Sequence, residues 1–467
     1  MKDKLMKIYN ILPVPLQNIA ITIEGFRIRT QRYGGNFNKY VNELDKSQYF
    51  DKKTIKENQE QKLKYIVKIA YDNVPYYRKL FRKNHLKPSD IKYIKDLDKI
   101  PILEKETVKK FVDDFISEDI DRKNIVANAT GGTTGTPLTI YYTKDAIRYV
   151  FALNEARVKH WAGVKSGDKL ASFLHGVDAF VPIPQTKPPF WRWNKAYNQL
   201  LFSVFHMNEN NLKYYIKKYN EFQPKIIQGY TSAIDIFAKY ILKYKIKVFA
   251  PKAISVSAET LLDIQRKNIE KAFNSKVYNE YTSAENVARI TECEKGRLHI
   301  NPELSIIEFK KIVGTENKYE IIGTNLFNVV MPLLRYKTGD IVTLTNETKC
   351  PCGRNFPLIK SIEGRTDDML MTPEGNYVGS ASMSVAIELV NNIKEVQIIQ
   401  NKIDEIIVKI VKVEKFNKYD LNLLIDRLKE RLGNKVSIKV IFVNQIKRTR
   451  AGKSRFIISN IIDKYKV

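Results

Sequence analysis

Between residues 125 and 345, short apolar runs alternate with longer segments in which apolar residues recur every three or four positions. The short runs are rich in Ile, Val and Tyr and predict strands, whereas the longer period predicts helices. We expect strands at 169–174, 226–229, 253–256, 276–281 and 319–324, and helices at 211–222 and 232–244. The alternation of strand and helix predicts α/β layering around a largely parallel sheet.

The apolar pattern changes over the last hundred residues. It predicts two strands, a helix and a further strand, at 396–400, 405–413, 421–432 and 437–443. That order is typical of a small α+β unit. The sequence therefore predicts an α/β protein of two domains, with a short hinge near Gly364. The first is a large multi-sheet α/β domain over residues 1–364, and the second is a small α+β domain over residues 365–467.

Length and composition agree with a folded protein of two domains. A chain of 467 residues exceeds what one hydrophobic core usually supports, and a hydrophobic fraction of 43% is ordinary for a soluble globular protein. We find no run of about 18 apolar residues, the length that a membrane span requires. Asp3 and Lys4 interrupt the opening segment where a signal peptide would have its apolar core. The expected location is the cytoplasm.

The formal net charge of +28 raises the question of a polyanionic partner. The surplus is spread along the chain, since residues 365–467 carry 19 Lys and Arg against 12 Asp and Glu. With so many Lys, Asn and Ile residues, a biased genome composition explains the charge at least as well as a nucleic acid does. We therefore expect no specific nucleic acid partner. A weaker attraction to acidic membrane surfaces or to anionic substrates stays open.

The segment Thr130–Pro137 contains three glycines and four threonines in eight residues. Glycine allows positive φ and close approach to a ligand, while threonine hydroxyls and free amide N–H groups can bind phosphate oxygens. No Gly-Lys-Ser/Thr follows, and a strand-like run comes next, which argues against a Walker loop and a dinucleotide fingerprint. From these residues alone, a phosphate cradle and a hairpin turn are equally favoured.

Two further segments have residues suited to a nucleotide site. In 278–285, the aromatic ring of Tyr281 could stack on a base and the Glu285 carboxylate could hold Mg²⁺ on ATP phosphates, although a capped strand end explains the segment equally well. In 335–340, Asp340 follows a glycine turn and could accept hydrogen bonds from ribose hydroxyls. An ordinary turn is the alternative there.

Two more segments could close over such a site. Residues 363–370 contain Arg365 and Asp367 and lie where the composition changes, as an interdomain hinge would, with a plain polar linker as the alternative. Residues 448–455 form a basic glycine loop that contains Lys453, with a solvated charge run as the alternative.

The chain has only three cysteines, Cys293, Cys350 and Cys352, and His299 follows the first of them by six positions. An odd number of cysteines in a cytoplasmic protein argues against disulfides. Three thiols and one imidazole make a Cys₃His set, the closed ligand shell of structural zinc. The Cys-x-Cys spacing is tighter than the usual Cys-x₂-Cys, and buried or idle thiols are the alternative.

Taken in order, these segments resemble the motif set of the adenylate-forming superfamily of acyl- and aryl-CoA synthetases, nonribosomal adenylation domains and luciferases. Within it the chain is most similar to the phenylacetate-CoA ligase branch, including members encoded among capsular and other surface polysaccharide genes. Similar cysteines recur in that branch. The resemblance is carried by Ala70–Arg78, Leu97–Lys105, Thr130–Pro137, Gly229–Ala233, Arg335–Asp340 and Gly364–Leu370.

The resemblance implies a binding site for ATP in the large domain. In the Gly/Thr segment, Thr133, Thr134 and Gly135 would wrap the β- and γ-phosphates, with Thr134 among the catalytic residues. Thr130 and Gly132 of the same segment are also expected to bind the nucleotide. The residues expected to line the adenine and α-phosphate pocket follow a strand that ends at Val256: Ser257, Ala258 and Glu259. Tyr281 would lie against adenine, and Asp340 would bind the ribose with Arg365 beside it.

The resemblance also implies the catalytic groups and a moving small domain. Glu285 would bind Mg²⁺, and Lys453 would bridge the substrate carboxylate and the α-phosphate while the acyl-adenylate forms. Asp367 would be the hinge about which residues 365–467 rotate as a lid. The expected reaction joins a small carboxylic acid to AMP with release of pyrophosphate. The acyl group would then pass to CoA, or to an amine or hydroxyl of a sugar precursor.

Departures from the family pattern leave other functions open. Gly131 stands where a serine is usual, and Ala284 stands where a threonine normally donates a hydroxyl to the α-phosphate. A non-catalytic nucleotide-binding scaffold of a polysaccharide pathway is therefore one alternative, and a polyanion-binding protein is another. Peripheral membrane association and a homodimer also stay open.

Overall fold

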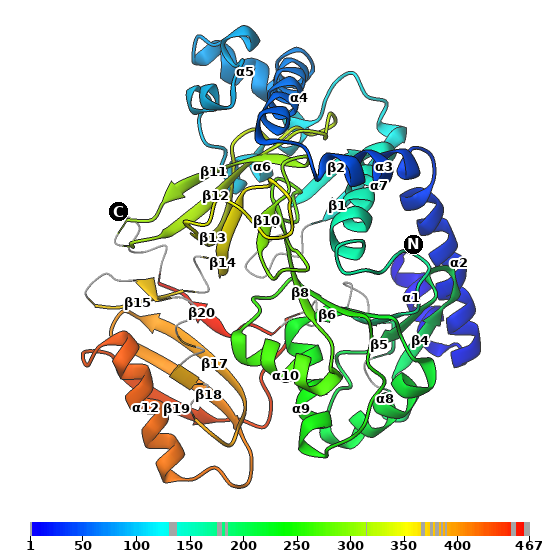
Figure 1. Ribbon diagram of the computed structural model, residues 1–467, viewed down its shortest axis with the longest axis vertical. Helices are drawn as coiled ribbons and strands as arrows, with labels where there is room; N and C mark the ends of the chain where they lie inside the picture. Colours follow the sequence, from blue (N-terminus) through cyan, green and yellow to red (C-terminus); the bar gives the residue numbers. More distant parts are fainter. Residues whose placement is uncertain are drawn as a thin grey trace.

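The computed structural model describes residues 2–129, 138–174, 180–182, 185–313, 315–365, 369–373, 377–378, 383, 386–387, 390–449 and 454–461. Within these residues, the strands form a twelve-stranded sheet, a four-stranded sheet and two small two-stranded sheets. Figure 1 shows the large sheet with helices packed against it and the four-stranded sheet as a separate layer at one side. The α/β class is confirmed, with a small α+β unit near the C-terminus.

Helices occupy most of the first 83 residues: α1 (Lys2–Ile11), α2 (Val14–Tyr33), α3 (Phe37–Ser47), α4 (Lys52–Asn73) and α5 (Pro75–Lys83). The Asp51 side chain caps α4 by accepting a hydrogen bond from the Thr54 backbone N–H at 2.7 Å. Helix α4 ends before Val74, where Pro75 starts α5 as its first residue. The buried faces of α4 and α5 pack into one apolar core with Leu138, Ile140 and Tyr336.

The order of strands in the large sheet is β11-β12-β13-β14-β10-β9-β8-β7-β6-β3-β5-β4. Their bounds are β3 (Leu170–Phe173), β4 (Trp191–Asn194), β5 (Gln199–Phe202), β6 (Ile226–Tyr230), β7 (Ala253–Ser257), β8 (Val277–Thr282), β9 (Arg289–Glu292), β10 (Leu298–Ile300), β11 (Ser305–Lys311), β12 (Lys318–Asn325), β13 (Tyr336–Leu344) and β14 (Leu358–Arg365).

Only the central strands β5, β3, β6, β7 and β8 pair in parallel, and the flanking strands pair antiparallel. The expectation of a largely parallel sheet is therefore correct for the centre and wrong for the flanks. Parallel pairing needs a long crossover, usually a helix, and no helix lies between β8 and β14 in the described residues. The strands β8 to β10, and β11 to β14, are joined by connections that turn the chain back without a helix among the residues described, so each strand in these two groups pairs antiparallel with the next.

Helices α8 (Glu209–Phe222), α9 (Thr231–Lys243) and α10 (Asp263–Phe273) supply crossovers beside the parallel strands, as Figure 1 shows in green. They bury an apolar core against those strands, which includes Phe173, Ile227 and Phe237. Because the strands run in the same direction, their carboxyl ends meet at one edge of the sheet. Residues that follow β6, β7 and β8 are therefore neighbours in space.

The elements around the Gly/Thr segment are a short helix, a hairpin and a longer helix: α6 (Lys105–Lys110), β1 (Ile125–Ala129), β2 (Thr139–Thr143) and α7 (Lys144–Leu153). Strands β1 and β2 pair antiparallel, with Ala129 opposite Thr139. Residues 130–137 lie between them and outside the described residues.

The C-terminal unit contains β15 (Leu370–Met371), β16 (Tyr377–Val378), β17 (Ile393–Lys402), β18 (Glu405–Lys412), α12 (Lys418–Leu432), β19 (Ser437–Phe442) and β20 (Ile457–Ser459). The order in its sheet is β19-β18-β17-β20, with β17 and β18 antiparallel and the outer pairs parallel. Leu424 and Leu428 of α12 pack on this sheet in a core of its own. The three strands and the helix expected between 396 and 443 are confirmed.

The substitution Gly229→Ala tests the close approach of β6 to β3. A Cβ atom at residue 229 would lie 2.7 Å from the Phe173 Cβ and 2.8 Å from its carbonyl oxygen. Because both strands lie in the buried centre of the sheet, we expect the substitution to lower the free energy of unfolding by about 1–3 kcal/mol. Thermal unfolding followed by circular dichroism should show a lower midpoint.

The matched control is Ser255→Ala on the neighbouring strand β7. It removes a buried hydroxyl that has no hydrogen-bond partner among the described residues, and it adds no atom. We expect the control to leave the unfolding midpoint nearly unchanged. Equal midpoints for the wild type and Gly229→Ala would contradict the close packing.

Candidate active site

A cavity of about 560 Å³ lies between the large sheet and the C-terminal unit. On one side it is lined by residues at the ends of β7, β8 and β14, by Asp340 in the middle of β13, and by residues of α9 and α10. On the other side it is lined by residues 390–396 and 454–457 of the C-terminal unit. A cavity of this size, between two units and at the carboxyl ends of parallel strands, is where α/β proteins commonly bind nucleotides.

Three of the predicted nucleotide-binding residues meet in this cavity. The Tyr281 hydroxyl at the end of β8 donates to the Asp340 Oδ2 at 2.7 Å, and the Arg365 Nε lies 3.3 Å from the Asp340 Oδ1. Asp340 on β13 stands directly opposite Arg365 on β14 in the strand pairing. Burial raises the pKa of Tyr281 well above its ordinary value, so the phenol stays protonated and acts as a donor.

The predicted adenine segment follows β7. Ala258 adopts a left-handed backbone conformation, with φ of 67°, and this bends the chain toward the cavity. Ala258 and Glu259 line the cavity, whereas Ser257 is not among the described lining residues.

The Glu259 carboxylate joins the two sides of the cavity. It accepts hydrogen bonds from the Ser232 backbone N–H at 2.8 Å, from the Ser232 hydroxyl at 3.1 Å and from the Ser454 backbone N–H at 2.7 Å. Burial raises the pKa of this carboxyl group, an effect that its hydrogen bonds oppose. Because Ser232 belongs to α9 and Ser454 to the C-terminal unit, Glu259 is a docking contact between them.

Glu285 lies beside the cavity and is not among its described lining residues. Its side chain is buried, and its Oε1 accepts a hydrogen bond from the Tyr336 hydroxyl at 2.9 Å. The backbone carbonyl of Glu285 accepts from the Tyr142 hydroxyl at 3.2 Å, which ties this loop to β2. The Glu285 carboxylate, which is predicted to bind a metal ion, is thus held in the same region as Tyr281 and Asp340.

Sequence reasoning assigned no role to Lys105, which lines the cavity at the start of α6. Burial lowers the pKa of its ammonium group, and the attraction of the Glu285 carboxylate opposes that shift. The segment Leu97–Lys105 carries part of the family resemblance, but a lysine in a helix start has no chemical signature of its own. Only the fold brings it to Glu285.

Arg448 is a second lining residue that sequence reasoning left without a role. Its Nη1 donates to the Ser232 hydroxyl at 3.0 Å, and its Nη2 donates to the Glu395 Oε2 at 2.9 Å. Arg448 therefore connects β17 of the C-terminal unit with α9 of the large sheet, beside the Glu259 contact.

The remaining predicted site residues lie outside the described residues: Thr130, Gly132, Thr133, Thr134, Gly135, Asp367 and Lys453. The structure does describe neighbours of these positions. Ala129 and Leu138 flank the Gly/Thr segment, and Ser454, which directly follows Lys453, lines the cavity.

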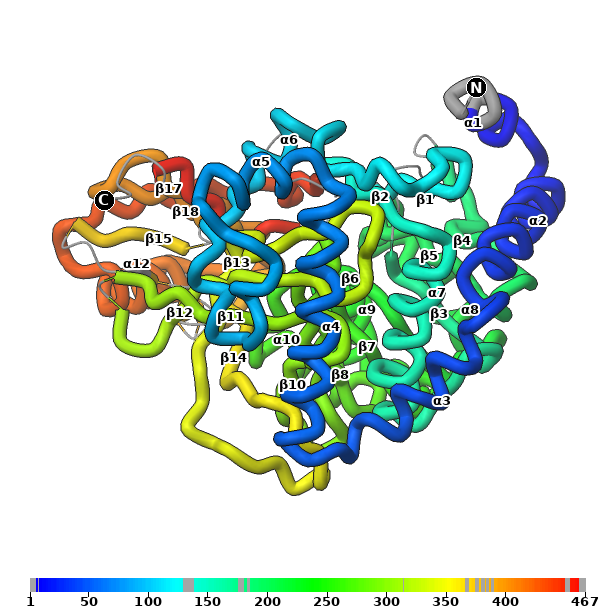
Figure 2. The backbone as a smooth tube through the Cα atoms, turned by 90° about the horizontal axis from the view of Figure 1, so that it is seen from above, coloured from blue at the N-terminus to red at the C-terminus, as the bar shows by residue number. Residues whose placement is uncertain are grey.

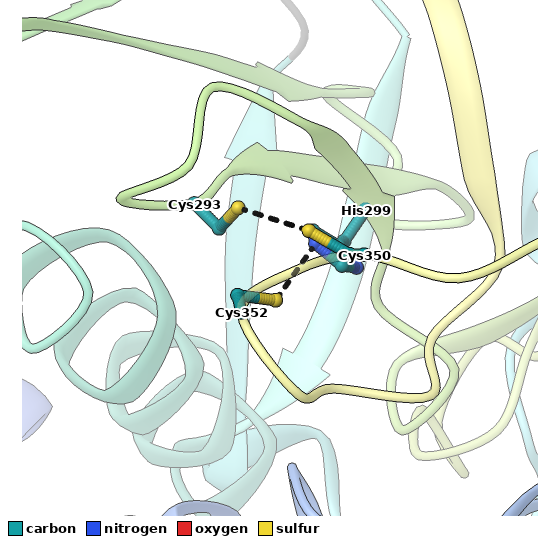
Figure 3. Close-up of side chains that lie close together, drawn as sticks. All are labelled: Cys293, His299, Cys350 and Cys352. Atoms are coloured by element: carbon teal, nitrogen blue, oxygen red, sulfur yellow. Dashed lines mark hydrogen bonds between the residues drawn. The ribbon is translucent and has the colours of Figure 1, made fainter. Parts of the chain in front are cut away.

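A second group of predicted residues meets away from the cavity. Cys293, His299, Cys350 and Cys352 place one ligand atom each within 4.8 Å of one another (Figure 3). None of the four lines the cavity. They come from the hairpin of β9 and β10 and from the connection between β13 and β14.

The distances in this cluster fit a tetrahedral zinc site. The Cys293 and Cys350 sulfur atoms are 3.7 Å apart, and the Cys352 sulfur is 3.4 Å from the His299 Nε2. With zinc–sulfur bonds of about 2.3 Å, a tetrahedron has a sulfur–sulfur edge of about 3.8 Å. Burial lowers the pKa of His299 to about 4, so near neutral pH the imidazole is uncharged and has a lone pair for a metal.

Comparisons with known proteins show the same fold and a similar sequence. The chain superimposes on the solved structure of 2-hydroxyisobutyryl-CoA ligase in the postadenylation state with R3-HIB-AMP at a TM-score of 0.70 and 18% identity, over 89% of this chain and 91% of that one. It is also 25% identical over 437 residues to a phenylacetate-coenzyme A ligase of Thermus thermophilus, covering 86% of this chain and 95% of the relative. The protein is an adenylate-forming ligase of the phenylacetate-CoA ligase branch.

A nearer relative defines the family. Protein CapK of Staphylococcus aureus is 37% identical over 462 residues, which covers 97% of this chain and 99% of the relative. Residues 370–460 match the family model of the CapK C-terminal domain. The chain therefore belongs to the CapK family.

The substitution Glu259→Ala tests the docking contact. It leaves the backbone N–H groups of Ser232 and Ser454 without this acceptor, which should weaken docking of the C-terminal unit by about 1–3 kcal/mol. We expect small-angle X-ray scattering to show a larger radius of gyration than for the wild type. The control is Glu414→Ala, which removes an exposed carboxylate of the same unit. An unchanged radius for Glu259→Ala would show that the contact does not hold the units together.

Proposed function

We propose that this protein activates a small carboxylic acid with ATP and Mg²⁺ as an acyl-adenylate and releases pyrophosphate. The observation that carries the proposal is the shared cavity, in which Tyr281, Asp340 and Arg365 of the large sheet face Ser454 of the C-terminal unit. Sequence motifs far apart in the chain thus contribute to one space that can hold a nucleotide.

The polar groups of the cavity suit the parts of ATP. Tyr281 offers an aromatic face to adenine, and Asp340, oriented by Tyr281 and Arg365, can accept hydrogen bonds from ribose hydroxyls. Lys105 supplies a positive charge beside Glu285. The triphosphate would lie there, with the Gly/Thr segment after β1 wrapped around the β- and γ-phosphates. The buried Glu285 carboxylate, with one oxygen bound by the Tyr336 hydroxyl, would hold Mg²⁺, which neutralises phosphate charge when bound.

In the proposed step, an oxygen of the substrate carboxylate attacks the α-phosphorus of ATP. A bond forms between that oxygen and the phosphorus, and the bond from phosphorus to the oxygen bridging the α- and β-phosphates breaks. Pyrophosphate leaves with the bonding electron pair. The Lys453 ammonium would offset the charge that develops on the phosphorus oxygens, and its position next to the lining residue Ser454 supports this role.

The second half of the reaction would transfer the acyl group: the acceptor atom bonds to the acyl carbon, the bond from that carbon to the phosphate oxygen breaks, and AMP leaves. CoA is the first candidate acceptor, because the Thermus thermophilus relative and the solved neighbour are named as CoA ligases. An amine or hydroxyl of a sugar precursor is the other, and the relationship to protein CapK supports a role in surface polysaccharide biosynthesis. We place the domain boundary at residues 364 and 365 and the hinge at Asp367, about which the lid would rotate between the two half-reactions.

We also propose that Cys293, His299, Cys350 and Cys352 hold a structural zinc ion. Four protein ligands would leave no open position for a substrate, so the ion would have no catalytic role. It would fasten the connection between β13 and β14 to the hairpin of β9 and β10. Asp340 lies on β13 and Arg365 on β14, so an ion that fastens the connection between these two strands would indirectly support the cavity.

The acid-activation proposal predicts ATP–pyrophosphate exchange with at least one acid from a broad panel. In Lys453→Ala, we expect the exchange rate to fall by about 10²-fold or more, because the variant loses a charge placed on the transition state. Binding of ATP should change much less. The control is Lys447→Ala, which removes an exposed lysine six positions earlier in the chain. Normal ATP binding without exchange for any acid would overturn the proposal.

The zinc proposal predicts one zinc ion per chain, measured by elemental mass spectrometry. Chelation or Cys352→Ser should release the ion and lower the thermal unfolding midpoint, because metal binding contributes to folding free energy. At temperatures where the chelated protein stays folded, we expect ATP binding to persist. Zinc-free protein with an unchanged unfolding midpoint would contradict a structural metal.

A further inference from the structure

Helix α2 packs on the edge strand β4 through polar side chains. The Asn18 Oδ1 accepts a hydrogen bond from the Trp193 backbone N–H at 2.9 Å, and the Thr22 Oγ1 accepts from the Lys195 backbone N–H at 3.2 Å. One helical turn separates Asn18 from Thr22, so both face the strand. The helix thereby satisfies backbone donors at the edge of the large sheet.

The inward face of α2 also carries a buried glutamine and a buried glycine. Gln17 is buried and accepts a hydrogen bond from the Arg192 Nε. Gly25 is buried too, and a Cβ atom at this position would lie 2.4 Å from the Asn194 Oδ1. The helix needs a glycine there because it approaches β4 so closely. Ile21 and Ile28 are half-buried on the same side, so this face holds polar, small and apolar residues together.

The outward face of α2 carries large apolar side chains that are exposed. Leu16, Ile19, Ile23 and Phe26 are 47%, 54%, 66% and 52% exposed. At about 100° per residue they fall within one sector of the helix, opposite Gln17 and Gly25. The preceding helix α1 adds two more exposed side chains, Ile8 and Ile11. We call these six residues the apolar stripe. A surface helix usually turns its apolar residues inward and polar residues outward, whereas α2 has large apolar side chains on both faces.

Positive charge accompanies the stripe. Residues 1–33 contain six Lys and Arg against two acids, and the whole chain carries a formal charge of +28. Arg27 borders the stripe, with a side chain that is 66% exposed and pairs with Glu24. An exposed apolar face next to basic residues is typical of helices that lie in the interface of anionic membranes.

We propose that the apolar stripe of α1 and α2 docks this protein on the surface of a bilayer that contains anionic lipids. In the described part of the chain, no helix is long and apolar enough to cross a membrane, so the protein would lie on the bilayer. A strip one helix wide offers less area than the roughly 800 Å² per partner that stable protein interfaces bury. Lipid chains can cover such a strip, and their anionic headgroups complement the basic residues.

The position of the stripe is compatible with turnover. Figures 1 and 2 place α1 and α2 at the opposite end of the molecule from the C-terminal unit. A membrane that contacts the stripe would therefore leave this unit free to dock and undock. This proposal is independent of the acid-activation proposal, since it concerns a different surface.

The test is flotation of the full chain with vesicles of 70% phosphatidylcholine and 30% phosphatidylglycerol, and with vesicles of phosphatidylcholine alone. We expect the wild type to float with the anionic vesicles. The double variant Ile19→Asp, Ile23→Asp should bind them about tenfold more weakly, because both side chains would lose burial among the lipids and would gain a charge repelled by the headgroups.

The matched control is Val313→Asp, which makes the same kind of change at a side chain that is 89% exposed in the turn between β11 and β12. It should bind like the wild type. Circular dichroism should give equal unfolding midpoints for all variants, because the substituted side chains are exposed. Wild type that stays unbound, or a double variant that floats like the wild type, would overturn the proposal. A wild-type dimer in light scattering that the double variant abolishes, without vesicle binding, would assign the stripe to a second copy instead.

Discussion

The parallel pairing of β6, β7 and β8 is the constraint on which the site depends. These three strands end at the same edge of the sheet, so Ser232, Glu259 and Tyr281 are neighbours although they are far apart in the sequence. On its other side β6 pairs with β3, and the two strands approach so closely that there is no room at Gly229 for a side chain against Phe173. Antiparallel strands then extend the sheet and bring Asp340 and Arg365 to the same cavity.

Much of this fold could be predicted from the sequence, because its signals are local. The strand at 226–230 and the helices at 209–222 and 231–243 have strong apolar periods, and they lie within three residues of their expected bounds. The direction of the flanking strands could not be predicted in this way. The direction of a strand depends on whether the connection before it is long enough to cross over. We expected such crossovers throughout the sheet and therefore predicted a largely parallel sheet.

The residues of the site also divide into those that the sequence could predict and those that it could not. Motif residues such as Tyr281, Asp340 and Arg365 could be predicted because their order along the chain resembles a known family, and the fold brings them together. Lys105 and Arg448 could not, because a single lysine or arginine has no distinctive spacing. The cysteine cluster could be predicted because the chain has just three cysteines, His299 follows the first by six positions, and similar cysteines recur in the related branch. The fold then brings all four residues together.

The hydrogen bonds to Asn18 and Thr22 from β4 and from Lys195, which directly follows it, have a consequence for geometry. They attach α2 rigidly to the edge of the large sheet, so the outward face of this helix has a fixed direction relative to every strand. A flexible tether would let the protein tumble above any surface that it binds. Here a surface that takes the apolar face also sets the tilt of the whole molecule, and with it the direction in which the cavity opens.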